Sequence, residues 1–188
     1  MRMHVVVIVA LTTVTPVLGQ VPGRMVVDTS IDRMTGKAAA AVTWTAIDSV
    51  HSRYAYLPTL VARCSPHGSI DVYLTGVPAH NSSRHDILGV ETGSDLRVDV
   101  KLDGWKKPKG SKLGEFTVQN DEAIWYFNGK QAISKLLLPT DTLLLRFTAL
   151  FGDYVTPEFH LGSDSVRRAV LKHVAEACGW TLPEKEDQ

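Results

Sequence analysis

Alternation of apolar and polar residues runs through most of the chain and predicts a protein built largely from β strands. The clearest example is DLRVDVKLD, residues 95–103, in which leucines and valines occupy every second position and charged residues lie between them. A period of two is typical of a strand that buries one face and exposes the other. The same pattern, bounded by turn residues, predicts strands over residues 42–48, 59–64, 69–75, 95–103, 112–120, 122–128, 142–150 and 154–161.

Short turn-forming segments join two pairs of these strands into predicted hairpins. SPHG, residues 65–68, lies between the strands of one pair, and Asn120-Asp121 lies between those of the other. Pro157 interrupts the last predicted strand. Because proline has no amide hydrogen to donate, that strand is expected at a sheet edge or at a bulge.

Helical spacing replaces the strand period in two segments. GKQAISKLLLP, residues 129–139, carries apolar residues three and four positions apart and ends at a proline, which predicts one short helix. A longer helix is predicted from an N-cap at Ser163 or Asp164 to Gly179. The face expected to pack on the sheet comprises Val166, Ala169, Val170, His173, Val174, Ala177 and Cys178. The face expected to contact water comprises Arg167, Arg168, Lys172 and Glu176.

The order of these elements predicts an α+β domain. We expect an antiparallel sheet of about seven or eight strands, or a sandwich-like arrangement of them, with one short helix and a C-terminal helix. The single domain is expected over residues 42–180. An N-terminal extension over 20–41 precedes it, and a polar tail over 181–188 follows it.

The first nineteen residues predict a secretory signal peptide. A short basic start precedes an apolar run from Val5 to Val14, and Val17 and Gly19 are suited to a cleavage before Gln20. The run, of about ten to fourteen residues, is too short to span a bilayer comfortably. An uncleaved N-terminal anchor is the alternative. We therefore expect a periplasmic or secreted protein with no membrane span after cleavage.

Cys64 and Cys178 are the two cysteines of the chain. An even number of cysteines in an exported protein predicts a structural disulfide, and two free buried thiols are the alternative. Their spacing matches neither a zinc ribbon nor a thioredoxin-type active site. Cys64 ends a predicted strand and Cys178 lies at the edge of the apolar helix face, so a bond between them would tie the last helix to the sheet.

The charge balance narrows the classes of partner. Twenty basic residues equal twenty acidic ones, which argues against a nucleic-acid binder or a protein held on an anionic membrane. WKKPKGSK, residues 105–112, is the candidate interaction loop. Trp105 could stack on a sugar or pack against a protein, and the lysines could meet anions. The alternative is a solvated loop with its tryptophan folded onto the sheet. The lysines of this loop are Lys106, Lys107, Lys109 and Lys112.

Other polar residues are weaker candidates for chemistry. Asp99, Asp103, Asp121 and Glu122 could supply a carboxylate pair for glycan hydrolysis, but their positions favour solvated acids. His80, His85 and Asp86 could bind a metal, yet they lie in a predicted loop without rigid geometry. His173 is expected to be a packed core histidine. We therefore predict no cofactor, no metal site and no catalytic residue.

Several short motifs together resemble the VasI/TagO family, exported proteins associated with type VI secretion. The motif residues are Trp44, Asp48-Ser49, Leu60 to Cys64, Arg97, Asp99, Trp105, Leu136, Leu143 to Phe147, Phe159 to Gly162 and Ala177 to Trp180. The resemblance covers roughly residues 42–180 and implies an accessory function in the periplasm, with no catalytic residue. We expect a non-enzymatic protein that binds an envelope protein or a peptidoglycan-like glycan. An envelope hydrolase and an inhibitor or recognition module are the alternatives.

Overall fold

A computed structural model gives the fold of the protein. The described residues are 23–31, 36, 38–47, 57–65, 67–78, 98–102, 109–111, 114–119, 122–148 and 154–184. The predicted signal peptide and the end of the polar tail lie outside these ranges. Every structural statement that follows concerns the described residues.

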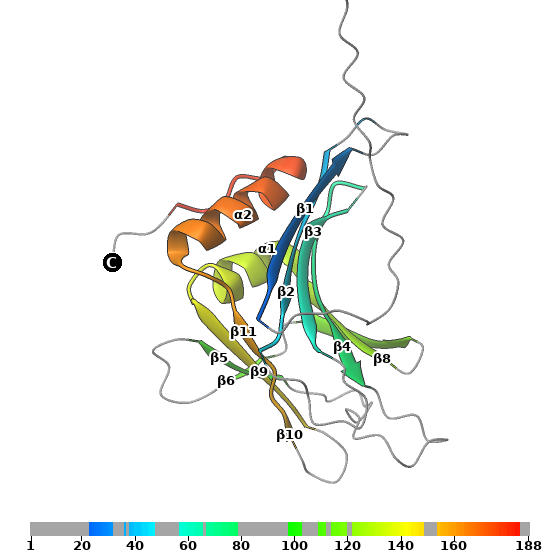
Figure 1. Cartoon of the computed structure of the whole chain (residues 1–188). Coiled ribbons are helices and arrows are strands. Elements are labelled where there is room, and N and C mark those ends of the chain that lie inside the picture. Colours follow the sequence, from blue (N-terminus) through cyan, green and yellow to red (C-terminus); the bar gives the residue numbers. More distant parts are fainter. Residues whose placement is uncertain are drawn as a thin grey trace, which may run out of the picture.

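Six antiparallel strands form the larger sheet (Figure 1). In chain order they are β1 (Met25–Ile31), β2 (Ala38–Thr45), β3 (Thr59–Cys64), β4 (Ile70–Pro78), β7 (Gly114–Gln119) and β8 (Glu122–Asn128). Their order across the sheet is β1-β2-β3-β4-β8-β7. Both predicted hairpins are present, because β3 pairs with β4 and β7 pairs with β8.

Five strands form the second sheet. They are β5 (Val98–Leu102), β6 (Lys109–Ser111), β9 (Thr142–Thr148), β10 (Tyr154–Val155) and β11 (Glu158–His160). The last predicted strand is divided at Pro157, and both of its parts pair with β9. The Ile47 amide, just after β2, donates to the Glu158 carbonyl at 2.9 Å. This bond joins the two sheets at one corner.

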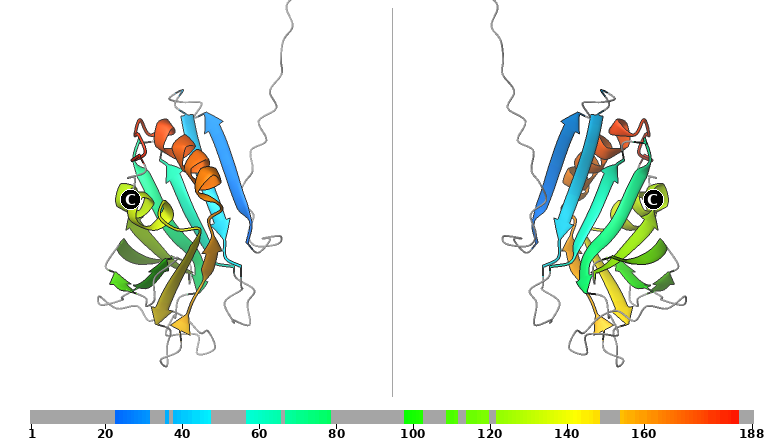
Figure 2. Two further views of the ribbon diagram at one scale, coloured as in Figure 1. Left: turned by 90° about the vertical axis from the view of Figure 1, so that its left-hand side faces the viewer. Right: turned by 90° about the vertical axis from the view of Figure 1, so that its right-hand side faces the viewer.

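Helices cover one face of the larger sheet. A short α1 (Gly129–Ala132) continues into a π-helical turn, η1 (Ile133–Leu137), and α2 spans Asp164–Ala177. The α2 helix packs on β2 and β3, and α1 packs on β4 and β8. Figure 2 shows the helices and the second sheet on the same side, and no described helix or strand covers the opposite side. The predicted fold class, antiparallel sheet with a short helix and a C-terminal helix, is confirmed.

The core lies between the larger sheet and its helical cover. Trp44, Leu60, Leu74 and Trp125 form a row of partners across four adjacent strands, and all four are buried. Leu171 and Val174 of α2 are fully buried against this side. Because successive side chains of a strand point to opposite faces, this row lies on the covered face and the residues between lie on the other.

The predicted orientation of α2 is wrong in part. Its buried side chains are Arg167, Val170, Leu171, Val174 and Ala175. Val166 is 43% exposed and His173 is exposed, whereas Arg167 is only 2% exposed. The buried positions recur at three and four residues, so they make one stripe, but it begins at an arginine. The sequence prediction assigns Arg167 to the solvent side because it is charged, and this moves the expected buried stripe of α2 toward Val166.

The larger sheet begins before residue 42. Strand β1 and the first residues of β2 lie in the segment that the sequence assigned to an N-terminal extension. Met25 of β1 packs against the core beside Trp44, its partner across the pair. MVVDTSI has no clean alternation because β1 is an edge strand with little burial on either face.

Candidate functional site

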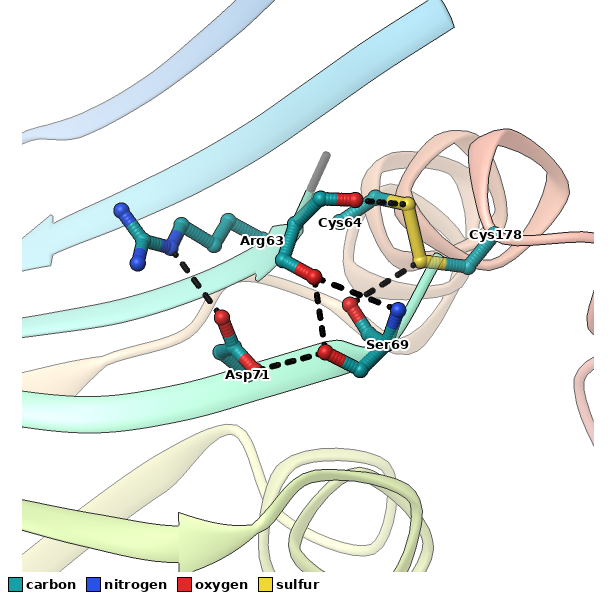
Figure 3. Close-up of a disulfide and its surroundings, with 6 residues drawn as sticks. Arg63, Cys64, Ser69, Asp71 and Cys178 are labelled. Atoms are coloured by element: carbon teal, nitrogen blue, oxygen red, sulfur yellow. Dashed lines mark hydrogen bonds and ion pairs between the residues drawn. A yellow bond between two sulfur atoms is a disulfide. The ribbon is translucent and has the colours of Figure 1, made fainter. Parts of the chain in front are cut away.

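A disulfide joins Cys64, at the end of β3, to Cys178, immediately after α2 (Figure 3). The sulfur atoms lie 2.08 Å apart and the Cα atoms 5.5 Å apart, so the predicted pairing is confirmed. The Cys178 Sγ also lies 3.2 Å from the Ser69 carbonyl oxygen. A disulfide sulfur has no hydrogen to donate, so this is a packing contact. The cystine fixes the end of α2 against the β3–β4 turn.

Polar bonds within that turn connect the cystine to the uncovered side of the sheet. The Ser65 amide donates to the Ser69 carbonyl at 2.8 Å, and the two serine hydroxyls lie 2.7 Å apart. The Ser69 hydroxyl donates to Asp71 Oδ1 at 3.2 Å. Asp71 Oδ2 in turn lies 3.4 Å from Arg63 Nε (Figure 3). Arg63 and Asp71 are thereby held in place from a turn that is itself fixed covalently.

We call the side of the larger sheet that no described helix or strand covers the open face. The strand registers place two rows of side chains across it. The first row is Val26, Thr43, Val61, Tyr73 and Tyr126. The second row is Asp28, Ala41, Arg63, Asp71 and Asn128. An apolar and aromatic row therefore runs beside a row rich in charged and amide groups.

Tyr73 is the centre of the contacts on the open face. Its ring centroid lies 5.7 Å from that of Tyr126, with the planes tilted by 43°. The Arg63 guanidinium carbon lies 5.2 Å from the centroid of Tyr73, within the range of a cation–π interaction. Burial raises the pKa of Tyr73, and the nearby Arg63 opposes part of this rise. The Tyr73 hydroxyl is thus protonated at neutral pH and can donate a hydrogen bond.

The chemistry offered by the open face is that of binding. Tyr126 is 40% exposed, so an aromatic ring is accessible beside the Arg63–Asp71 pair. Rings of this kind can pack against apolar groups, while the guanidinium and carboxylate can exchange their mutual contact for bonds to a ligand. The sequence predicted these strands but did not bring Arg63, Tyr73 and Tyr126 together, because the registers that align them join distant segments.

A second polar cluster surrounds the buried Arg167. Its Nη1 atom donates to Asp141 Oδ1 and to the Gly162 carbonyl, both at 2.5 Å. Its Nη2 atom donates to the Leu138 carbonyl at 3.0 Å and to Asp164 Oδ1 at 3.3 Å. These bonds join α2 to the segment between η1 and β9, which gives the arginine a structural role. The sequence missed it, although the acidic Asp164 three residues earlier is a possible signal.

Most of the other predicted site residues lie in parts of the chain that the structure does not describe. Trp105, Lys106, Lys107 and Lys112 lie outside the described residues, as do His80, His85, Asp86, Asp103 and Asp121. Lys109 begins β6, Asp99 lies in β5 and Glu122 begins β8, with only their backbones described. His173 is exposed on α2, so the expected core histidine is wrong.

Two other kinds of site are absent from the described parts of the chain. No group of three or more histidine, cysteine, aspartate or glutamate side chains is arranged there to hold a metal ion. None of the helices described is long and apolar enough to cross a membrane. Comparison with protein-family models, with curated proteins and with solved structures finds no match.

Proposed function

We propose that this chain is an exported, non-enzymatic accessory protein of the cell envelope, periplasmic or secreted, that binds a protein partner through the open face. The observation that carries this proposal is the Tyr73–Tyr126 pair with Arg63 and Asp71 beside it, on the side of the sheet that no described helix or strand covers. The cystine supports the location, because stable disulfides are typical of oxidising compartments.

A protein partner fits the open face better than a flat glycan ring. Tyrosine and arginine are enriched among the side chains that dominate the energy of protein interfaces. The two tyrosine rings are tilted by 43° and so do not form one flat platform. The apolar and aromatic row beside the charged row offers the mixture of apolar and polar contacts that protein interfaces use. A peptidoglycan-like glycan is the alternative ligand.

The resemblance to the VasI/TagO family supports an accessory role in type VI secretion. That role is in keeping with shared motif residues that hold the frame together, such as Cys64 and Cys178. The WKKPKGSK loop is a second surface for the same partner. Charge reversal at Lys106, Lys107 and Lys109 tests it, and unchanged binding removes the loop from the interface.

The open face is tested by capture from envelope extract followed by direct binding of the purified partner. Tyr126→Ser removes the accessible ring, and Val166→Ser is the matched control. The two residues have similar exposure, 40% and 43%, but Val166 lies on α2. We expect Tyr126→Ser to weaken binding by at least about tenfold, as for a central interface residue. Val166→Ser should bind as the original chain does.

Equal binding by the original chain and Tyr126→Ser would refute the open face as the binding surface. Sedimentation with purified peptidoglycan provides the second arm of the experiment. Retention on peptidoglycan that depends on Tyr126, without capture of a protein, would replace the protein partner by a glycan. Circular dichroism spectra of both variants should match that of the original chain, since each substitution is at the surface.

A further inference from the structure

Strand β1 combines a free edge with exposed apolar side chains. Five large hydrophobic side chains of the described chain are exposed, and three lie in β1: Val26 at 40%, Val27 at 40% and Ile31 at 69%. The strand stands at the end of the six-stranded order, and no described strand lies beyond it (Figure 2). Such an edge presents unpaired backbone groups to another strand.

The hydrogen bonds of β2 show which backbone groups of β1 point outward. The Ala46 amide donates to the Pro58 carbonyl at 2.8 Å, toward β3, and the Thr45 amide donates to the Arg24 carbonyl at 2.9 Å, toward β1. Successive residues of a strand bond to opposite neighbours. The even-numbered residues of β1 therefore bond to β2, and the amides and carbonyls of Met25, Val27 and Thr29 face outward.

The charges beside this edge are self-complementary. Arg24 and Asp28 lie four residues apart, a separation of about 13 Å along an extended strand, so they cannot pair with each other. In an antiparallel pair of two identical strands centred on Val26, Arg24 of each copy lies opposite Asp28 of the other. The pairing therefore places two pairs of opposite charges across the contact. A centre at Asp28 would instead place the two like charges opposite each other.

We propose that β1 pairs with the β1 strand of a second copy of this chain, antiparallel and centred on Val26. In this register Val26 lies opposite Val26 of the second copy, and Met25 lies opposite the second copy's Val27 with its outward backbone groups in bonding position. The two-fold axis is perpendicular to the sheet, so two six-stranded sheets become one. Both open faces then lie on the same side of the dimer.

Charge reversal tests the register in solution. Sedimentation velocity of the exported chain should show a dimer whose population rises with concentration. Asp28→Arg and Arg24→Asp each place like charges opposite each other, so each should raise the dimer dissociation constant by about tenfold or more. The double variant Arg24→Asp/Asp28→Arg restores the complementary pairs and should restore the dimer. A monomer at all concentrations, or a dimer unaffected by the single reversals, would overturn the proposal.

Cysteine cross-linking tests the same register by distance. Directly opposite residues that share no backbone bonds lie about 4.5 Å apart at Cα, within disulfide range, so Val26→Cys should cross-link two copies. Ser30→Cys is the control, since the two copies of this residue would lie about 26 Å apart. Cross-linking of Ser30→Cys alone, or cross-links only to another protein, would contradict the self-pairing. Neither the sedimentation test nor the cross-linking test uses the envelope partner, so the outcomes of both are independent of the proposed function.

Discussion

Replacing both cysteines, in the double variant Cys64→Ala/Cys178→Ala, removes the covalent link between β3 and the end of α2. The linked residues are separated by 114 positions in the chain. For a loop of this length the chain-entropy model gives about 4.8 kcal/mol of stabilisation at 25 °C, through restriction of the unfolded chain. A domain of ordinary stability has about 5–15 kcal/mol in total. We therefore expect the double variant to lose about 3–5 kcal/mol and to remain marginally folded.

Urea unfolding followed by tryptophan fluorescence measures this loss, because Trp44 and Trp125 are buried and report on the core. The urea dependence of the free energy should be steeper in the double variant, since its unfolded chain exposes more surface. The original chain unfolded in the presence of a reductant is the control and should match the double variant. A loss below about 1 kcal/mol, or free thiols in the native protein, would refute the reasoning.

Substitutions at three further positions test the frame and the open face. Gly129→Ala should destabilise the domain by about 2 kcal/mol or more, because an added Cβ would overlap the Ile70 carbonyl. Urea unfolding measures the loss. Lys130→Ala is the control, because Lys130 is exposed in the same helix. Arg167→Ala should lower the free energy of unfolding by about 3 kcal/mol. Arg167→Met should lower it clearly less, because methionine fills the space while the two acidic partners remain in contact with water. An equal loss in both variants would show that the ion pairs dominate. The pKa of Tyr73 is higher in the folded chain than in the unfolded chain, so the unfolded chain loses the hydroxyl proton at a lower pH. Stability should therefore fall as the pH rises above 10. Tyr73→Phe should flatten that fall in alkaline unfolding curves, and an unchanged slope would contradict it.

The sequence predicted best the elements that are bounded by clear turn residues. Strand β3 matches its predicted range, residues 59–64, because it lies inside the sheet and carries turn residues after it. The short helix was expected over 129–139, and the structure has α1 and η1 there. The π-helical turn was not predicted. It is marked by the Leu138 amide donating to the Ile133 carbonyl five residues earlier, at 2.9 Å.

The features that escaped prediction depend on contacts between distant segments. AAAAV at the start of β2 is compatible with a helix or a strand, and pairing with both β1 and β3 decides it. Arg167 is buried because acceptors from the η1–β9 segment and from the turn before α2 surround it, which no local pattern records. The open face likewise depends on strand order, since Tyr73 and Tyr126 meet only when β8 pairs with β4.

The position of the cystine also bears on how the protein is made. Cys64 and all the described strands are synthesised before α2, and the second thiol follows that helix. The α2 helix covers the side of β2 and β3 that carries Trp44 and Leu60, and this side stays exposed until α2 has been synthesised. The disulfide therefore cannot form until α2 has been synthesised, so it secures the helical cover after the strands have been made and does not guide their pairing.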